Sequence, residues 1–152
     1  VGVTDAPAVD QLYAMDIGAQ FVGEIGGTLS KSSQRISVRA QLLHKCRILG
    51  WDGFDAGRAA VVRSGGIDIV LTENRTSVTN PQILQSVGIA LDRYKIITVK
   101  LGYLYPALEK VALRHIIAFT NGVSSIKIEK MPFAHIPHPM YPFDRDFEWD
   151  TS

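Results

Sequence analysis

The chain has 152 residues and a formal net charge of +1, with 46% hydrophobic and 20% charged residues. These values are typical of a globular domain with a sizeable core, and they exclude a disordered chain and a strongly basic nucleic-acid-binding surface. No apolar run approaches the ~20 residues needed to span a bilayer, so no membrane association is expected. The single cysteine excludes an internal disulfide framework and favours a reducing, cytoplasmic location.

The first part of the chain predicts a strand, a helix and two further strands. Residues 1–4 have the composition of the end of a strand. Asp5 is a good helix N-cap and Pro7 lies in the first turn, and the helix that they begin is expected to end at Gly18. Alternating apolar residues predict strands at 19–25 and 35–43, the second half-buried and antiparallel.

The middle of the chain predicts a β-hairpin. Residues 44–47 continue or turn the preceding strand, Ile48-Leu49 is expected to begin a partner strand, and residues 51–57 form a loop. Two short runs rich in β-branched residues, 59–62 and 67–71, are then joined by Ser64-Gly65-Gly66. The two glycines permit the positive φ of a tight hairpin turn, which makes Gly65 and Gly66 structural residues.

The second half predicts alternating strands and helices. Asn80 or Thr79 caps a short helix with Pro81 at its first position and Gly88 after its end. Residues 95–100 are the most strand-like run of the chain, 102–112 have helical spacing, and 116–119 predict another buried strand. This order favours crossover connections and a partly parallel sheet. We therefore expect a single α/β domain with a mixed sheet, a few short helices and a proline-rich, extended C-terminal tail.

Polar residues crowd the exit of the second hairpin strand, where ligands are often bound. The same residue types also cap helices and satisfy loop backbone groups, which is the simpler interpretation. Lys100 is the charge at the end of the apolar run 95–100, where it binds an anion, pairs with a carboxylate or extends into solvent. The candidate ligand or interface residues are Arg63, Thr72, Asn74, Arg75, Lys100 and Tyr103.

No catalytic or metal-binding group can be assembled from the residues. His135 and His138 have a spacing seen at metal sites, but on extended backbone their side chains point to opposite faces. His44 and Cys46 share one face of a predicted strand and could form a thiolate–imidazole pair, although no third residue that would orient them is visible. We therefore predict no metal ligand and no catalytic residue in this chain.

Three segments together resemble a known family: RAAVVRSGGIDIVLTENRT, SVGIALDRYKIITVKLGYLYPAL and MPFAHIPHPMYPFDRD. In that order and at that spacing they are similar to the C-terminal domain of the microcystinase C (MlrC-like) family of bacterial metallopeptidase-related proteins. The matching positions are Gly65, Gly66, Asp68, Thr72, Arg75, Gly88, Ile89, Lys100, Pro139, Tyr141, Pro142 and Asp144. The resemblance covers most of residues 1–152 and gives Pro142 and Asp144 structural roles.

The resemblance implies a two-part protein in which an absent N-terminal domain holds the zinc and is the partner of this chain. A start at Val1 rather than Met agrees with a chain that begins inside the C-terminal domain. Many members carry a Lys-Ser-x-x-His-Phe-Arg-like stretch where this chain has Leu104 and Pro106 at the His and Arg positions. The polar roles of that stretch therefore do not carry over, and the substrate is left open.

Three functional hypotheses follow. The first is a non-catalytic C-terminal portion of a zinc-dependent amide or peptide hydrolase, inactive alone, which supports the catalytic domain and shapes the substrate cleft or a homo-oligomer. The alternative is a free-standing module that binds a small anionic ligand or a protein. A third is a self-contained enzyme that uses Cys46 and His44.

Overall fold

A computed structural model describes residues 2–30, 33–50, 53–118, 128 and 131–148. The chain divides into two compact units, Val1–Leu113 and Arg114–Ser152. The first unit contains all the helices and strands of the described residues, apart from an isolated turn at residue 128. None of the described helices is long and apolar enough to cross a membrane.

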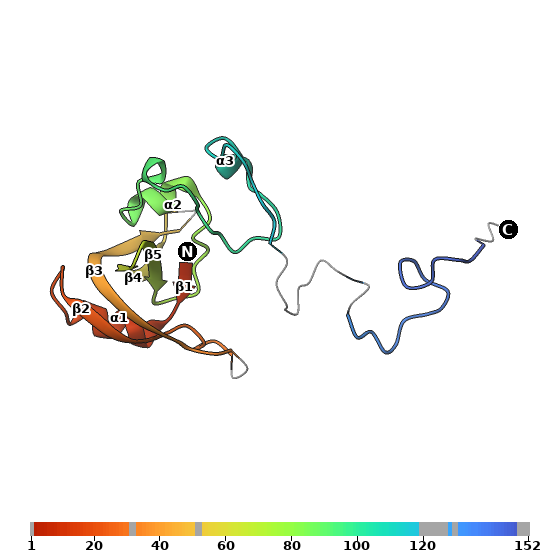
Figure 1. The fold of residues 1–152 in the computed structure, drawn as a ribbon, viewed down its shortest axis with the longest axis horizontal. Coiled ribbons are helices and arrows are strands. Elements are labelled where there is room, and N and C mark those ends of the chain that lie inside the picture. Colours follow the sequence, from red (N-terminus) through yellow and green to blue (C-terminus); the bar gives the residue numbers. More distant parts are fainter. Residues whose placement is uncertain (1, 31–32, 51–52, 119–127, 129–130, 149–152) are drawn as a thin grey trace. The chain divides into compact units, whose positions relative to one another are not determined.

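The first unit is built on a five-stranded sheet with the order β1-β5-β4-β3-β2 (Figure 1). The strands are β1 (Gly2–Thr4), β2 (Gln20–Ile25), β3 (Ile36–Leu49), β4 (Asp55–Ser64) and β5 (Ile67–Thr72). Only β1 and β5 are parallel, and the other neighbours are antiparallel. The prediction of an α/β unit with a mixed, partly parallel sheet is confirmed.

The central hairpin forms as predicted, but its two glycines differ. Ser64 pairs with Ile67, so the turn consists of Gly65 and Gly66 alone. Gly65 has a φ of 57°, in the left-handed region that disfavours side chains. Gly66 lies outside that region, so the prediction of a positive φ is right for Gly65 and wrong for Gly66.

A β-bulge in β3 lets one sheet serve two hydrophobic cores. Leu42 pairs with Val62 and His44 pairs with Val61, which leaves Leu43 as an extra residue between two adjacent partners. Before the bulge, Ala40 and Leu42 belong to the first core, and after it Ile48 belongs to the second. Since side chains alternate with a period of two, the extra residue moves the even-numbered positions to the opposite face.

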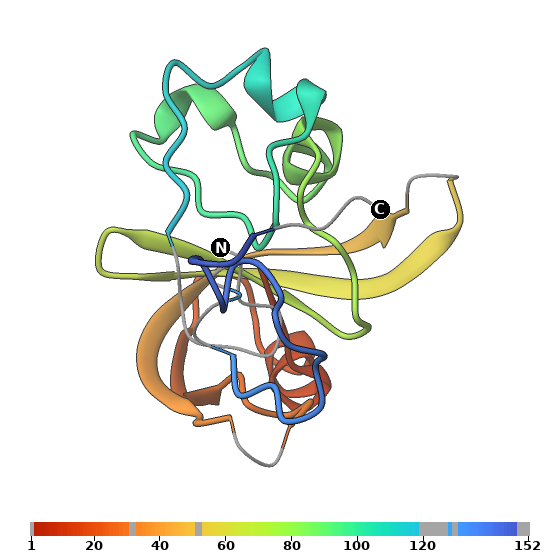
Figure 2. The same ribbon diagram turned by 90° about the vertical axis from the view of Figure 1, so that its right-hand side faces the viewer.

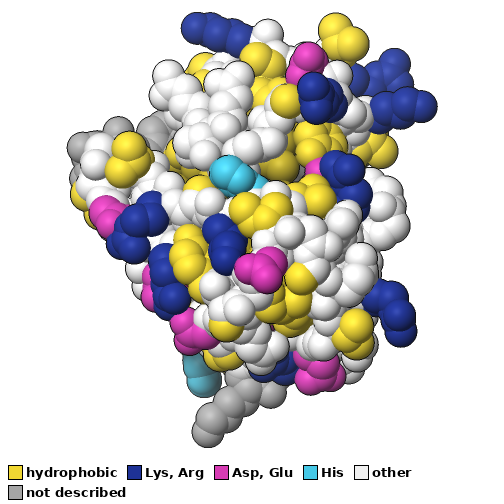
Figure 3. All heavy atoms as spheres, turned by 90° about the vertical axis from the view of Figure 1, so that its left-hand side faces the viewer, with side chains coloured by type: hydrophobic (Ala, Val, Ile, Leu, Met, Phe, Trp, Pro, Cys, Tyr) yellow, Lys and Arg dark blue, Asp and Glu magenta, His cyan; other side chains and the backbone are white. Residues whose placement is uncertain are grey.

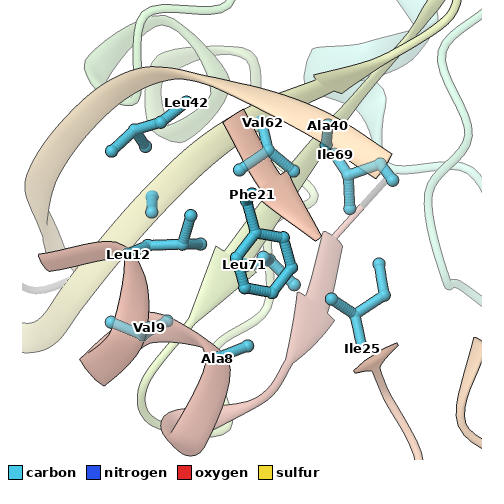
Figure 4. Close-up of a cluster of buried hydrophobic side chains, with 11 residues drawn as sticks. Ala8, Val9, Leu12, Phe21, Ile25, Ala40, Leu42, Val62, Ile69 and Leu71 are labelled. Carbon is cyan, nitrogen blue, oxygen red and sulfur yellow. The ribbon is translucent and has the colours of Figure 1, made fainter. Parts of the chain in front are cut away.

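Helix α1 (Ala6–Tyr13) covers the first core. Ala8, Val9 and Leu12 are buried against Phe21, Leu42, Val62 and Leu71 of the sheet, together with Ala40, Ile25, Ala60 and Ile69 (Figure 4). The Asp5 side chain caps the helix by accepting the Ala8 N–H at 3.1 Å, as predicted. The helix ends at Tyr13, earlier than predicted, and Ile17, which would continue its apolar spacing, is 61% exposed.

Helix α2 (Pro81–Ser86) covers the second core on the other face of the sheet, and Figure 2 shows the two helices on opposite sides. Asn80 caps it by accepting the Gln82 N–H at 2.8 Å, and Gly88 follows it with a φ of 82°, both as predicted. A 3-10 turn, η1 (Leu91–Arg93), and the short helix α3 (Pro106–Glu109) come next. Leu108 of α3 is also buried in the second core.

The predicted strands at 95–100 and 116–119 are wrong for the residues that the structure describes. Residues 95–100 are not in a strand; Ile97, Val99 and Leu101 pack against the second core while Ile96 is 82% exposed. That contact produces the same alternation as a strand, although none of the described strands pairs with this segment. Residues 116–118 have no regular secondary structure and Ile116 is exposed, while residue 119 lies outside the described residues. The helix predicted at 102–112 is shorter in the structure, where it is α3. Within residues 95–118, the predicted crossover connections are therefore not formed.

Two smaller boundaries also differ from the prediction. Ile48 and Leu49 end β3 and do not begin a partner strand, since Leu49 still pairs with Asp55. β4 therefore begins at Asp55, inside the segment expected to be a loop.

In the second unit, Asp144 organises a local turn. Its carboxylate accepts the Met140 N–H at 2.8 Å and lies 2.6 Å from the Nδ1 atom of His138. These two contacts hold the pKa of Asp144 below its ordinary value. Pro142 lies in the same turn and follows a cis peptide bond. The extended course of the whole proline-rich tail stays a prediction.

Candidate functional site

Arg63 and Asp68 form an ion pair across the β4–β5 hairpin. The two-residue turn at Gly65-Gly66 places them directly opposite each other on β4 and β5. The Arg63 guanidinium donates from Nε and Nη2 to the two Asp68 carboxylate oxygens at 2.6 and 2.7 Å. Such two-point pairing fixes both side chains more firmly than a single contact does.

The pair is asymmetric in its exposure. The Asp68 side chain is 3% exposed, whereas that of Arg63 is 51% exposed, so the carboxylate lies below the guanidinium. The Tyr94 hydroxyl also donates to Asp68 from the chain after η1. The Arg63 hydrogen bonds lower the pKa of Asp68 and the Tyr94 hydrogen bond lowers it further, while burial opposes them. Burial and the bond to Asp68 raise the pKa of Tyr94.

His44 reaches the same place because of the bulge in β3. The bulge sets His44 opposite Val61, on the face that carries Arg63 and Asp68. The half-buried His44 ring packs against Gly88: a Cβ added to this glycine would lie 3.3 Å from the His44 ring. The close approach of the chain after α2 therefore depends on a residue without a side chain.

These groups surround a cavity of about 300 Å³, which we call the Arg63 pocket. Its walls come from β3, β4, β5 and the segment after α2. The residues that line it are Leu43, His44, Val61, Arg63, Asp68, Val87, Gly88, Ile89, Ala90, Arg93 and Tyr94. The volume is at the lower end of the range for small-molecule sites.

The pocket combines an apolar wall with a surplus of hydrogen-bond donors. Neither the His44 ring nor the Arg93 guanidinium has a hydrogen-bond or ion-pair partner among the described residues. Asp68 is the carboxylate that lines the pocket, and Arg63 already compensates its charge. The arrangement is suited to a small anion rather than to a cation or to acid–base catalysis by Asp68, whose pKa is held low.

The polar residues at the end of β5 and after it mainly bind their own loop and the start of β4. The buried Thr72 donates from Oγ1 to the Asn74 carbonyl at 2.9 Å. Asn74 in turn donates from Nδ2 to the Ala56 carbonyl at 3.2 Å. Glu73 binds Arg58 at 2.8 Å, and this contact lowers the pKa of Glu73 to about 2. The simpler interpretation of this cluster therefore agrees with the contacts.

The predicted candidate residues do not converge on one site. Arg63 lines the Arg63 pocket, whereas Arg75 lines a second hollow of about 270 Å³ with Phe54 and Ile83. Lys100 is exposed and borders neither hollow. Tyr103 is 63% exposed, and its ring meets that of Tyr105 edge to face with centroids 5.0 Å apart.

No group of three or more His, Cys, Asp or Glu side chains that could hold a metal is found among the described residues. His44 and Cys46 lie on the same face of β3, as predicted, but burial raises the pKa of the Cys46 thiol. A raised pKa disfavours the thiolate that a nucleophilic cysteine needs. The described residues therefore do not offer a ligand set for zinc, which the family resemblance implies for the absent N-terminal domain.

The sequence did not predict that Asp68, His44, Arg93 and Tyr94 join Arg63 in one pocket. Asp68 is absent from the candidate ligand residues, although a two-residue turn already places it opposite Arg63. His44 depends on a bulge that has no local signal in the sequence. Tyr94 reaches Asp68 across 26 residues, through the path of α2 and η1.

Lysine and arginine side chains are spread over the face drawn in Figure 3, with aspartate and glutamate between them. A broad basic surface for a polyanion is therefore not visible on that face.

Comparisons with known proteins agree with this architecture. No significant match is found among the curated proteins. A solved structure, the crystal structure of a "putative metallopeptidase" from Mesorhizobium sp. BNC1 at 2.13 Å resolution, matches with a TM-score of 0.75 and 24% identity. The match covers 99% of this chain and 32% of that chain, so this chain spans about a third of its length. The family model described as MlrC C-terminus matches residues 1–135. The chain therefore belongs to the MlrC C-terminus family.

Proposed function

We propose that this chain is the non-catalytic C-terminal portion of a zinc-dependent amide or peptide hydrolase. The observation that carries the proposal is the family match over residues 1–135. The similar fold in a protein about three times as long supports it, because further polypeptide is present in that protein. On this proposal, the zinc ligands belong to polypeptide outside these 152 residues.

The role of the chain in this proposal is structural. The sheet with a core on each face forms a stable body that can support a neighbouring domain and shape the substrate cleft. Metal-assisted hydrolysis needs a bound metal to activate water or polarise the carbonyl, and the neighbouring domain would supply it. Assembly into a homo-oligomer and a cytoplasmic location, which the single cysteine favours, are parts of the same proposal.

The experiment measures zinc in two purified, tag-free proteins: this chain and the longer polypeptide that the proposal requires. Both are dialysed against a weak chelator before elemental analysis. We expect stoichiometric zinc in the longer polypeptide and none in this chain. Amide hydrolysis, measured as amine release from a peptide mixture, should follow the zinc.

Stoichiometric zinc in the isolated chain would refute the proposal. Circular dichroism of the isolated chain is the control, because a folded chain without zinc separates a missing ligand set from a failure to fold. Hydrolysis by the isolated, zinc-free chain would refute the non-catalytic role as well.

A further inference from the structure

We infer that the Arg63 pocket is a binding site for a small organic carboxylate. The inference does not depend on the proposed function, because it uses only groups that surround one cavity of the first unit. Three cationic or donor side chains, Arg63, Arg93 and His44, line this cavity of about 300 Å³.

The charge balance of the pocket favours an anion. The Asp68 carboxylate already accepts two hydrogen bonds from Arg63 at 2.6 and 2.7 Å and a third from Tyr94. The positive charge of Arg93 has no partner among the described residues. The pocket thus carries one uncompensated positive charge even when His44 is neutral, and a carboxylate would compensate it.

The donors are also placed for an anion. A guanidinium has five N–H groups, and Asp68 occupies two of those on Arg63. The Arg63 side chain is 51% exposed, so further N–H groups can reach a ligand. Because Asp68 fixes this guanidinium, little side-chain freedom is lost when a ligand binds.

The apolar wall distinguishes an organic acid from an inorganic anion. Leu43 and Ala90 line the pocket beside the charged groups and are only partly buried, whereas the lining residues Val61, Val87 and Ile89 are already buried. Phosphate would leave Leu43 and Ala90 in water, whereas a branched aliphatic acid can cover them and gain hydrophobic free energy. The chemistry that fits is therefore a carboxylate on a short apolar body.

The experiment titrates the whole chain with isobutyrate and follows binding by two-dimensional NMR of the backbone amides. We expect saturable shifts at His44, Gly88 and Ala90, which lie on two walls of the pocket. Isobutyramide has the same shape without the charge and should bind at least roughly tenfold more weakly, because hydrogen bonds to a charged group are the stronger ones. Inorganic phosphate should also bind more weakly.

Two arginine variants test the location. Arg93→Gln should weaken isobutyrate binding roughly tenfold, the size expected for one charged hydrogen bond. Arg39→Gln is the matched control, since Arg39 is an exposed arginine on the same sheet that does not line the pocket. It removes the same charge and should leave binding unchanged. His44→Gln provides a second variant within the pocket.

Three results would overturn the inference. The first is the absence of saturable shifts with isobutyrate in the folded wild-type chain. The second is an equal loss of binding in Arg93→Gln and Arg39→Gln, which would assign the effect to net charge. The third is binding of isobutyramide or phosphate as tightly as isobutyrate, which would exclude recognition of an organic carboxylate. Urea unfolding midpoints equal to wild type show that the variants are folded.

Discussion

Replacing Asp5 by alanine tests how far one buried carboxylate holds the first unit together. The Asp5 side chain is completely buried. Its Oδ1 atom accepts the Ala8 N–H at 3.1 Å, and its Oδ2 atom accepts the Gly26 N–H at 2.8 Å and an Arg35 N–H at 3.3 Å. The carboxylate therefore joins the start of α1 to the turn after β2.

The free energy of unfolding should fall by about 2 to 3 kcal/mol in Asp5→Ala. Loss of the helix cap contributes about 1 kcal/mol. The partly buried Gly26 N–H is left without its acceptor, which contributes about 1 to 2 kcal/mol. Arg35 adds little, because its side chain is 37% exposed and water replaces the contact.

Urea unfolding followed by circular dichroism measures this loss. With a slope of about 2 kcal/mol per molar urea, the midpoint should fall by about 1 to 1.5 M at an unchanged slope. Asp5→Asn should lie between alanine and wild type, because an amide oxygen can still cap Ala8 but the NH₂ group faces another donor at Gly26. Asp16→Ala is the control, since Asp16 is exposed and its side chain has no partner among the described residues. A loss below about 0.5 kcal/mol in Asp5→Ala would refute the reasoning, since ordinary surface substitutions fall in that range.

Three further outcomes are expected. Folding lowers the pKa of Asp68 from its ordinary value of 3.8, so the ionised carboxylate stabilises the fold fully above pH 3.8, and this contribution is lost as the pH falls through the folded-state pKa. In Asp68→Asn, the urea midpoint should therefore decrease less steeply below about pH 4 than in the wild type. Gly65→Val should lower the free energy of unfolding by about 1 to 2 kcal/mol, because φ at Gly65 is 57°, whereas Gly66→Val should lower it much less. Thermal unfolding measures both losses, and equal losses would contradict this reasoning. Burial raises the pKa of Cys46, so its thiol should react with a disulfide reagent at pH 7.5 more slowly than free cysteine, and a faster reaction would be contrary to the structure.

Features that depend on neighbouring residues could be predicted from the sequence. Asp5 and Asn80 each cap the helix that follows, and Gly65 supplies the turn of the hairpin. In each case the physical cause lies within three residues of the signal. The hairpin strands at 59–62 and 67–71 also followed from runs of β-branched residues bounded by turns, whereas the partly parallel sheet was expected from connections in the second half and arises instead from the pairing of β1 with β5.

Features that depend on distant partners were predicted less well. Residues 95–100 have the alternation of a strand, and every second side chain is indeed packed on a core. A strand also needs a hydrogen-bonding neighbour, and nothing in the run itself says whether one is present. Periodicity therefore predicted which face is buried but not the kind of backbone that buries it.

The candidate site shows the same division between local and distant causes. Arg63 could be chosen from the sequence, and counting residues across the two-residue turn would have paired it with Asp68. Arg93 and Tyr94 join them only because the chain returns over the sheet through α2 and η1. The sequence therefore identified Arg63, whereas the path of the chain brings Arg93 and Tyr94 to the pocket.

One extra residue in β3 connects the pocket to the stability of both cores. If β3 were regular, with Leu43 paired and no bulge, the period of two would place His44 on the α1 face and Lys45 on the α2 face. Lys45 donates to the Tyr13 and Met15 carbonyls at 3.2 and 2.7 Å, so its ammonium group would lose these acceptors and face an apolar core instead. The same shift would remove Ile48 from the second core, where it is buried. The bulge is therefore required by the packing on both faces of the sheet, and the position of His44 in the Arg63 pocket is a consequence of that packing.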